Sequence, residues 1–464
     1  MPIVEHVVVL MLENRSFDNL LGQLYPKSDP FDGIDLAETN PWHRPDGIVE
    51  TIRAWTSRGS PAPPLPNEDP GEFFDDIVMQ LCGLRADTRG PPSMEGFIDN
   101  YMRQPSEQGE PKRDPRSIMH QFAPDQSRAL ATLARAFGVS DRWYASAPCE
   151  TWPNRYFTHC GTAGGYVNNE RTHFPYRWPR FLRTIFRRLD SRGYNWRVYF
   201  HDLPQSATLI ELWPKIPTRF CLFEDEFERH ALGGRLPTYS FIEPRYYPAW
   251  SSQALPNDQH PPHDIRYGDQ LIASVYNAVR AAPTWERTLL IVTYDEHGGC
   301  FDHAPPPAAV SPGGPYPDGF RFDRYGPRVP TVIVSPYVKP GSVIRPAAGE
   351  AYPFDHCSIQ ATLHKVFDLG PPLTPRVAAA PDLTPALTLT APENAGPESI
   401  VWDQRPASRE EVQADLLRPR NRHQKNLRSP MHLFPGVAAN LTSRVRGLGA
   451  RTADKFCRKP RRAR

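Results

Sequence analysis

The sequence lacks three features: a long apolar run, a large excess of charge of one sign, and closely paired cysteines. A membrane-spanning helix needs about 18 or more consecutive apolar residues, and no such run occurs, so we expect none. The 54 lysines and arginines nearly balance the 52 aspartates and glutamates. The overall charge therefore gives no indication of nucleic-acid binding. The seven cysteines form no C-x-x-C pair, which excludes the zinc and redox motifs built on that spacing.

A secretion signal is also missing from the first residues, MPIVEHVVVLMLENRSF. They have no basic segment and no small-residue cleavage site, and their apolar run ends in Glu13 and Asn14, so we expect no signal peptide. Scattered thiols in an odd number are typical of a reduced protein, and we expect a cytoplasmic or peripheral membrane location. The alternative is an exported protein with one or two disulfides, such as Cys149 with Cys160.

Proline is the residue in excess, with 54 among 464 residues, while 39% hydrophobic residues suffice for a large core. We expect proline-rich stretches such as Asp29–Glu68 and Ala304–Pro317 to form long surface loops on a compact scaffold. From Arg418 to Arg464 the chain carries fourteen basic residues and one acidic residue. We therefore divide the chain into a main domain, residues 1–405, and a basic tail, residues 406–464.

Short apolar runs alternate with helical patterns along the main domain. The apolar runs predict strands at Ile3–Leu12, Asn195–Phe200, Tyr239–Glu243, Thr288–Tyr294 and Val329–Tyr337. The amphipathic patterns predict helices at Gln126–Phe137, Phe181–Gly193, Tyr267–Ala282 and Cys357–Gly370. Strands that are apolar along their whole length are typical of a parallel sheet covered on both faces. The predicted fold class is α/β, a three-layer α/β/α sandwich with long proline-rich loops.

Two of the predicted strands end in pairs of oxygen-bearing side chains. Glu13 and Asn14 follow the first strand, and Asp295 and Glu296 follow the strand Thr288–Tyr294. In open α/β sheets functional groups gather at the carboxyl ends of the strands. Buried carboxylates are costly unless they are compensated, and a divalent cation is the simplest compensation. The alternative is that each pair only caps a helix or holds a loop.

The segment ETWPNR, Glu150 to Arg155, has the pattern of a helix start. Thr151, followed two residues later by proline, is typical of an N-cap residue, and this pattern taken alone favours the capping role. A helix start is also a place where phosphate binds, and a threonine hydroxyl there is a candidate nucleophile beside a metal ion.

Histidine supplies candidate acids and bases near neutral pH. NDQHPPHD carries His260 and His263 in a proline-rich loop, and FDHCS carries His356 before a predicted helix. A structural role is the alternative for each of them.

Together these motifs resemble the phosphoesterase family of bacterial and plant non-specific phospholipases C and related acid phosphatases. The segments that carry the resemblance are ENRSFDNLLG, DRWYASAPCETWPNR, NDQHPPHD, TYDEHGGCFDHAPPP and YGPRVPTVIVSPYV. They occur in family order between about Ile3 and Leu369. The resemblance implies an alkaline-phosphatase-like sandwich, with residues 1–405 as the catalytic domain.

The resemblance also implies roles for single residues. Glu13, Asn14, Asp295 and Glu296 would bind a metal ion, and Thr151 would be both a ligand and the nucleophile. His260, His263 and His356 would surround the phosphate or serve the leaving group. The sequence departs from the family at EDPGEFF, where Glu72 stands at a position that often holds histidine, so an anion replaces a group suited to phosphate.

The implied activity is metal-dependent hydrolysis of phosphate esters, chiefly a phospholipase C reaction on phospholipids through a phosphothreonine intermediate. An acid phosphatase acting on soluble monoesters and a non-catalytic relative that binds phosphorylated ligands or membranes are the alternatives. The oxygen ligands suit Ca, Mg or Mn, with zinc as a further candidate. The basic tail is either a contact for anionic membranes or a solvated, disordered segment.

Overall fold

The structure of the chain is a computed structural model that describes residues 4–57, 64–85, 90–105, 113–169, 182–402, 406–421 and 424–427. The strands in these ranges are β1 (His6–Leu12), β2 (Thr39–His43), β3 (Val49–Arg53), β4 (Gly138–Ser140), β5 (Trp196–Phe200), β6 (Phe220–Leu222), β7 (Tyr239–Glu243), β8 (Thr288–Tyr294), β9 (Thr331–Val334) and β10 (Ser342–Val343). The α-helices are α1 (Phe17–Leu21), α2 (Phe74–Cys82), α3 (Phe97–Arg103), α4 (Arg128–Ala136), α5 (Thr151–Cys160), α6 (Ile185–Ser191), α7 (Ile216–Arg219), α8 (Phe223–Leu232), α9 (Ile265–Arg280), α10 (Cys357–Phe367), α11 (Pro375–Ala379) and α12 (Arg409–Leu417).

Eight strands form one mixed sheet in the order β10-β4-β9-β8-β1-β7-β5-β6. Strands β8, β1, β7, β5 and β6 run parallel to one another. Strand β9 runs antiparallel to both of its neighbours, so the prediction of a parallel sheet is wrong at this strand. The chain passes from β8 to β9 through a long loop without a helix, and a parallel return usually requires a crossover helix.

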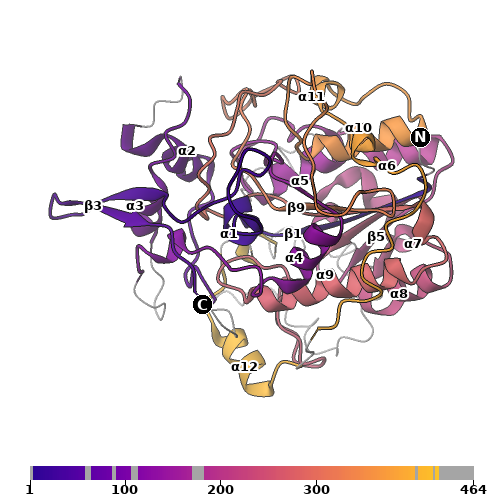
Figure 1. Cartoon of the computed structure of the whole chain (residues 1–464), viewed down its shortest axis with the longest axis horizontal. Helices are drawn as coiled ribbons and strands as arrows, with labels where there is room; N and C mark the ends of the chain where they lie inside the picture. Colours follow the sequence, from indigo (N-terminus) through magenta and orange to yellow (C-terminus); the bar gives the residue numbers. More distant parts are fainter. Residues whose placement is uncertain are drawn as a thin grey trace, which may run out of the picture.

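Helices cover both faces of this sheet, as Figure 1 shows. Helices α4, α8 and α9 pack together on one face, and α5, α6 and α10 pack together on the other. The three-layer α/β/α sandwich predicted from the sequence is confirmed.

The central strands form where the sequence is apolar without interruption. Residues 7–12 of β1 and all of β8 are buried, which is typical of a strand covered on both faces. Burying one large aliphatic side chain contributes about 1.5–3 kcal/mol, so these two strands anchor the core. The five predicted strands and four predicted helices are present, with ends that differ by a few residues. Phe181, the predicted start of one helix, lies outside the described residues.

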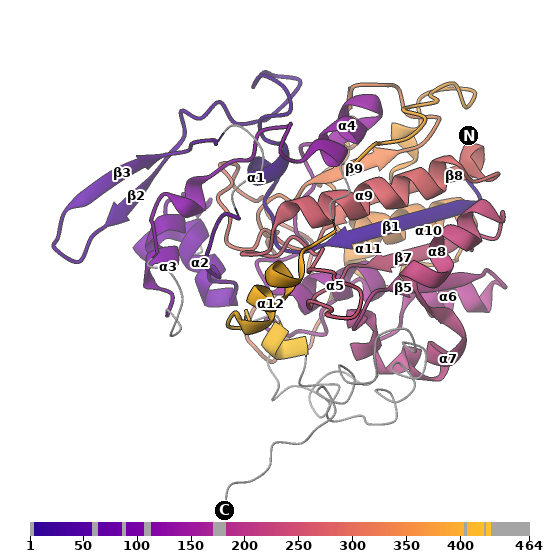
Figure 2. The ribbon, with the colours of Figure 1, turned by 90° about the horizontal axis from the view of Figure 1, so that it is seen from below.

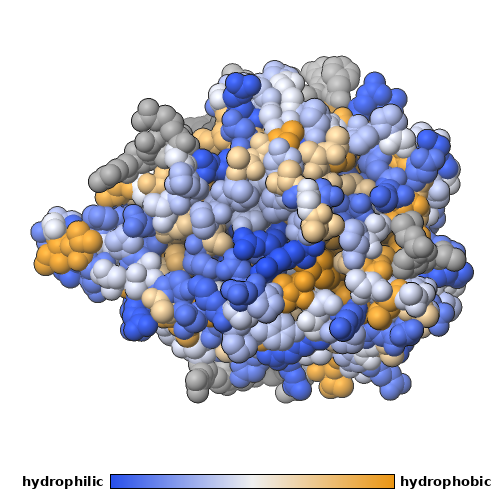
Figure 3. Space-filling view, turned by 45° about the horizontal axis from the view of Figure 1, so that its top comes forward, coloured by the Kyte–Doolittle hydropathy of each residue, from blue (hydrophilic) through white to orange (hydrophobic). Residues whose placement is uncertain are grey.

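One predicted loop contains regular structure. The proline-rich stretch Asp29–Glu68 includes the antiparallel hairpin of β2 and β3, which projects from the sandwich in Figure 2. The tight turn between these strands contains Asp46 and Gly47, and Gly47 has a φ of +85°. An Asp-Gly pair between two short strands is typical of a β-hairpin, so the sequence contained a signal for strands within this predicted loop. Ile48 and Val49, at the turn of this hairpin, are each 56% exposed. A hydrophobic patch lies at the left end of the molecule in Figure 3.

Within the described ranges, five cysteines are free thiols: Cys149, Cys160, Cys221, Cys300 and Cys357. The alternative pairing of Cys149 with Cys160 is not formed, because these residues lie at opposite ends of α5, a helix about 15 Å long.

Within the described residues, no helix combines the length and apolarity that a membrane crossing requires.

The described part of the basic tail packs against the main domain. Val412 of α12 and Leu427 are buried. Gln424 donates to the carbonyl oxygen of Tyr246, and its own carbonyl accepts a hydrogen bond from the Tyr247 hydroxyl. Residues 428–464 lie outside the described ranges, and the domain boundary at residue 405 stays a prediction.

Helix α4 depends on a carboxylate from another helix. Asp269 of α9 accepts hydrogen bonds from the backbone N–H groups of Ala129 (2.7 Å) and Leu130 (2.9 Å) and from the Ser127 hydroxyl (3.3 Å). These N–H groups belong to the first turn of α4, where they have no partner within the helix. Ser127, the N-cap residue of α4, does not itself cap this turn with its side chain.

We predict that Asp269→Asn lowers the free energy of unfolding by about 1–3 kcal/mol, because an amide nitrogen would face a backbone donor. Urea denaturation followed by circular dichroism measures this change. Asp125→Asn is the matched control, since Asp125 is exposed just before the same helix. Equal stability of the two variants would contradict the role given to Asp269.

Candidate active site

Two neighbouring parallel strands bring four polar residues to one edge of the sheet. Leu12, at the end of β1, is paired with Tyr294, at the end of β8. Glu13 and Asn14 therefore lie beside Asp295 and Glu296, and all four side chains are fully buried. The backbone N–H groups of Asn14 (3.1 Å) and Glu296 (2.8 Å) both donate to Asp295 Oδ1.

Asn14 sits in an unusual backbone conformation at the centre of this group. Its φ of +55° lies in the left-handed region, which asparagine tolerates better than most residues. The next loop approaches it closely, because a Cβ at Gly298 would collide with the Asn14 carbonyl. Sequence and packing therefore fix the direction of the Asn14 side chain.

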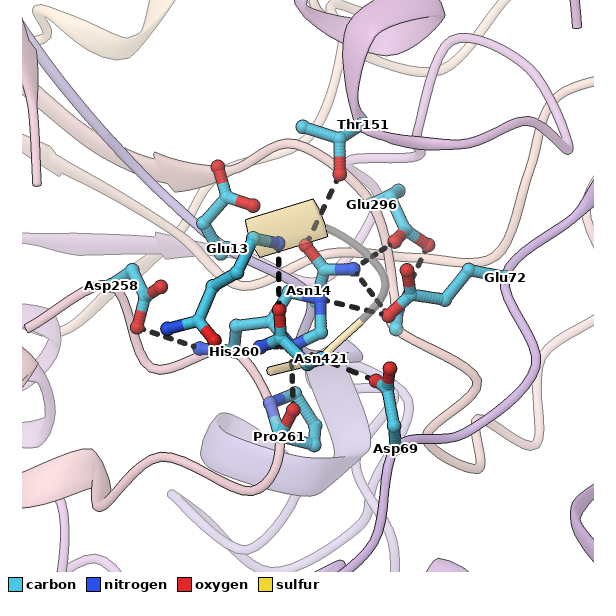
Figure 4. Close-up of polar contacts among 12 residues, drawn as sticks. Glu13, Asn14, Asp69, Glu72, Thr151, Asp258, His260, Pro261, Glu296 and Asn421 are labelled. Carbon is cyan, nitrogen blue, oxygen red and sulfur yellow. Dashed lines mark hydrogen bonds and ion pairs between the residues drawn. The ribbon is translucent and has the colours of Figure 1, made fainter. Parts of the chain in front are cut away.

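Thr151 faces Asn14 from the other side of the site, as Figure 4 shows. It is the first residue of α5, and Glu150 occupies the N-cap position without a side-chain cap. The capping role considered for Thr151 is therefore wrong. Its hydroxyl instead donates to Asn14 Oδ1 at 3.5 Å. Asn169 holds this helix start, because its N–H donates to Glu150 Oε2 and its Oδ1 accepts from the Trp152 N–H.

Arg155 is a site residue that the sequence analysis missed. Its Nε donates to Asp295 Oδ2 at 3.0 Å and its Nη2 to Glu13 Oε1 at 2.5 Å. The signal was its position four residues after Thr151, which places both side chains on one face of the helix. Gln205, also missed, donates to the same Glu13 oxygen at 2.5 Å.

Glu72 points into the site. The Asn14 side-chain amide donates to Glu72 Oε1 at 2.9 Å and also to Glu296 Oε1. His260 Nε2 lies 3.0 Å from the same Glu72 oxygen, so the two form an ion pair. The carboxylate at this position therefore does not turn away from the other site residues (Figure 4).

His260 is held on both ring nitrogens. Its Nδ1 donates to the carbonyl oxygen of Pro261 at 2.6 Å, and its Nε2 faces Glu72. Burial opposes the charged form of His260, but the carboxylates of Glu72, Asp69 and Asp258 outweigh it and raise the pKa well above its usual value. His260 is therefore a cation beside Asn14.

His263 forms an aspartate–histidine pair in the same loop. Its Nδ1 donates to Asp258 Oδ1 at 2.6 Å, a partner that the sequence analysis did not identify. Its Nε2 lies 3.4 Å from the Gln424 side-chain amide, so the described tail residues border this histidine.

His356 holds backbone at the edge of the site. Its Nε2 donates to the backbone carbonyl of Asp295 at 2.6 Å, and its Nδ1 accepts from Trp143 Nε1 at 3.4 Å. Burial lowers its pKa to about 4, so the ring is neutral. These contacts favour a role in positioning Asp295.

The Arg15 side chain connects two loops near the site. It donates to the carbonyl oxygens of Gln259 and Leu65, each at 2.7 Å, and so ties the histidine loop to the segment before Glu72.

The donor set at the strand ends fits a divalent cation. Burial raises the pKa of Glu13, Asp295 and Glu296, and a neighbouring carboxylate raises it further for Glu13 and Glu296. In the described part of the chain, no arginine or lysine pairs with Glu296 or Glu72. A hard cation held by carboxylate and amide oxygens would restore the charged forms of these groups.

A second acidic group has a different character. In this second group, the possible ligand atoms of Asp18, Asp302 and His303 lie within 4.8 Å of one another. The same is true of Asp69, Glu72 and His260 in the candidate active site. Arg328 donates to both Asp18 and Asp302 at 2.9 Å. Burial opposes the charged form of His303, but Asp18 and Asp32 raise its pKa to about 10. This second group is an internal ion-pair network that needs no added cation.

These features suit the hydrolysis of phosphate esters, and comparison with known proteins gives the family. A sequence profile of the phosphoesterase family matches residues 4–370, and the chain belongs to this family. It is therefore a phosphoric ester hydrolase.

Similar proteins come from plants and bacteria. The chain is 33% identical to non-specific phospholipase C3 of Arabidopsis thaliana over 408 residues, which cover 86% of this chain and 76% of that protein. It is 36% identical to non-specific phospholipase C6 of the same plant, over 79% of this chain and 68% of that protein. It is 29% identical to non-hemolytic phospholipase C of Pseudomonas aeruginosa, over 84% of this chain and 58% of that protein.

Among solved structures, a protein in the alkaline phosphatase superfamily from Vibrio parahaemolyticus aligns with a TM-score of 0.33 and 12% identity, covering 82% of this chain and 71% of that chain.

We predict that Glu13→Gln and Asp295→Asn each weaken divalent metal binding by about tenfold or more, since each removes one charge from the ligand group. Calorimetric titration with Ca, Mg, Mn and zinc measures the affinities. Wild-type affinity should rise from about pH 5 to about pH 8, because the raised carboxylate pKa values make protons compete with the metal.

Asp32→Asn, in the Arg328 network, is the control and should bind metal like the wild type. Wild-type affinity in either Glu13→Gln or Asp295→Asn would refute the shared metal site.

Proposed function

We propose that the protein is a phospholipase C-type phosphodiesterase that uses Thr151 as its nucleophile and a divalent cation as its cofactor. One observation carries the proposal: the Thr151 hydroxyl, at the start of α5, faces Asn14 among buried carboxylates. Glu13, Asn14, Asp295, Glu296 and Thr151 would hold the cation.

The cation, when bound, lowers the pKa of the threonine hydroxyl and withdraws charge from the phosphoryl oxygens. Thr151 Oγ forms a bond to phosphorus, and the bond from phosphorus to the leaving alcohol breaks. Water then cleaves the phosphothreonine and restores the hydroxyl. Arg155 keeps Thr151 in register with the strand ends, because it bonds Glu13 and Asp295 from the same helix.

His260 is our candidate for the group that protonates the leaving oxygen. It is charged, and its Nε2 reaches the Glu72 oxygen that also binds Asn14, which connects it to Thr151 through two side chains. His263, oriented by Asp258, is the second candidate.

The names of the similar plant and bacterial proteins support a phospholipid substrate, since they are called phospholipases C. The same centre could also serve an acid phosphatase on soluble monoesters. Product analysis separates the two: phosphocholine released from phosphatidylcholine supports our proposal, and free phosphate released only from soluble monoesters refutes it.

We predict that Thr151→Ala lowers kcat by about a thousandfold or more, because the nucleophile is lost. Thr151→Ser should retain measurable turnover, and mass spectrometry of acid-quenched enzyme should find phosphate on peptides containing residue 151.

Thr158→Ala is the matched control, because Thr158 is buried two turns further along the same helix and contacts Met11. Full metal-dependent turnover by pure Thr151→Ala would eliminate Thr151 as the nucleophile.

The basic tail would assist on anionic membranes. Ten lysines and arginines and one aspartate follow Leu427, and each basic residue near an anionic surface contributes about 1 kcal/mol.

We predict that a chain ending at Leu427, which keeps the packed tail residues, floats less with phosphatidylserine liposomes than the full chain does. Both chains should behave alike with neutral liposomes. Equal flotation of the two chains with anionic liposomes would show that the residues after Leu427 do not contribute to membrane binding.

A further inference from the structure

Glu72 accepts from two donors, one of which belongs to Asn14, the residue that contacts Thr151. Asn14 Nδ2 and His260 Nε2 approach its Oε1 at 2.9 and 3.0 Å. The other end of the same Asn14 amide accepts from the Thr151 hydroxyl. The Glu72 carboxylate therefore lies one side-chain amide away from the reacting oxygen, in contact with donors suited to a phosphoryl oxygen.

The backbone on both sides of Glu72 is fixed. The Gly71 carbonyl accepts from Gln80 Nε2 at 2.7 Å, and the Phe73 N–H donates to Asp76 Oδ2 at 3.1 Å. A Cβ at Gly71 would come within 2.4 Å of the side-chain ends of Asn100 and Gln104, which would have to shift to admit it. Glu72 itself is only 2% exposed. Its charge is therefore held in the site.

We propose that Glu72 determines substrate specificity by charge: it disfavours dianionic phosphomonoesters relative to monoanionic phosphodiesters. This inference rests on the proposed function and deepens it by assigning the choice of ester class to one side chain.

The charges around Glu72 give the physical reason. Four carboxylates, on Glu13, Glu72, Asp295 and Glu296, would be balanced by Arg155, His260 and one divalent cation, so the charges of these groups sum to about zero. Asp69, 3.9 Å from His260, adds a further negative charge. A diester brings one negative charge, and a monoester brings two when its second ionisation, with a pKa of about 6, is complete. Charges repel strongly in a buried, water-poor site. The additional negative charge of the monoester therefore makes its binding in the site less favourable than the binding of the diester.

The test compares p-nitrophenyl phosphate with bis(p-nitrophenyl) phosphate at pH 8, using wild-type protein loaded with the cation that supports turnover. Glu72→Gln keeps the acceptor oxygen and removes the charge. We expect the ratio of kcat/KM for diester over monoester to fall by about tenfold or more, or about 1.4 kcal/mol. Glu72→Asp keeps the charge and changes the contacts, and its ratio should stay within about threefold of the wild type.

Asp75→Asn is the control, because it removes one exposed carboxylate from the adjacent helix α2. It should leave the ratio unchanged.

A binding measurement supplies a readout besides turnover. Calorimetry of the same proteins should show Glu72→Gln binding inorganic phosphate about tenfold more tightly, with a smaller change for dimethyl phosphate.

Three results would overturn the role of Glu72: an unchanged ratio in Glu72→Gln, the same ratio in Glu72→Gln and Glu72→Asp, or weaker metal binding in Glu72→Gln with equal loss on both esters. If the wild-type protein hydrolyses neither ester, the proposed function fails, and phosphate affinity alone decides the role of Glu72.

Discussion

The candidate site depends on one physical constraint: carboxylates that are buried together must be balanced by positive charge. Glu13, Asp295 and Glu296 end two parallel strands, and Glu72 reaches them from a loop. An uncompensated buried charge is strongly unfavourable. Arg155 pairs with Glu13 and Asp295 and leaves Glu296 and Glu72 to other groups. A bound cation would therefore contribute to the electrostatic balance of the fold as well as to the chemistry.

Arg155 also connects this balance to Thr151, the proposed nucleophile. Because Thr151 and Arg155 lie one helical turn apart, the salt bridges that neutralise the strand ends also fix the start of α5. Asn14 completes the link, since its left-handed backbone directs one amide toward both Thr151 and Glu72. The same contacts therefore position the Thr151 hydroxyl and the carboxylates. Even a conservative substitution at Arg155 should displace both.

The sequence predicted the parts of this arrangement that local pattern controls. The long apolar strands β1 and β8 and the polar pairs that end them follow directly from periodicity. The strands β4, β6 and β10 could not be predicted, because two or three residues are too few to show a periodic pattern. The direction of β9 could not be predicted either, because tertiary contacts decide how a strand pairs. Arg155 was missed because its spacing of four residues from Thr151 points to the site only if Thr151 itself faces the strand ends, which tertiary packing decides.

The two acidic groups of the described chain show why similar composition leads to different chemistry. At Asp18 and Asp302, the guanidinium of Arg328 bonds both carboxylates and His303 adds a second positive charge, so the protein closes the network by itself. At the strand ends, Arg155 bonds only two of the carboxylates and His260 pairs with Glu72, while the Asn14 amide, a neutral group, donates to Glu72 and Glu296. An amide satisfies hydrogen bonds without cancelling charge. The difference between the structural network and the candidate active site thus lies in where the chain places asparagine instead of arginine, and in our proposal Asn14 leaves the site open to a cation and an anionic ester.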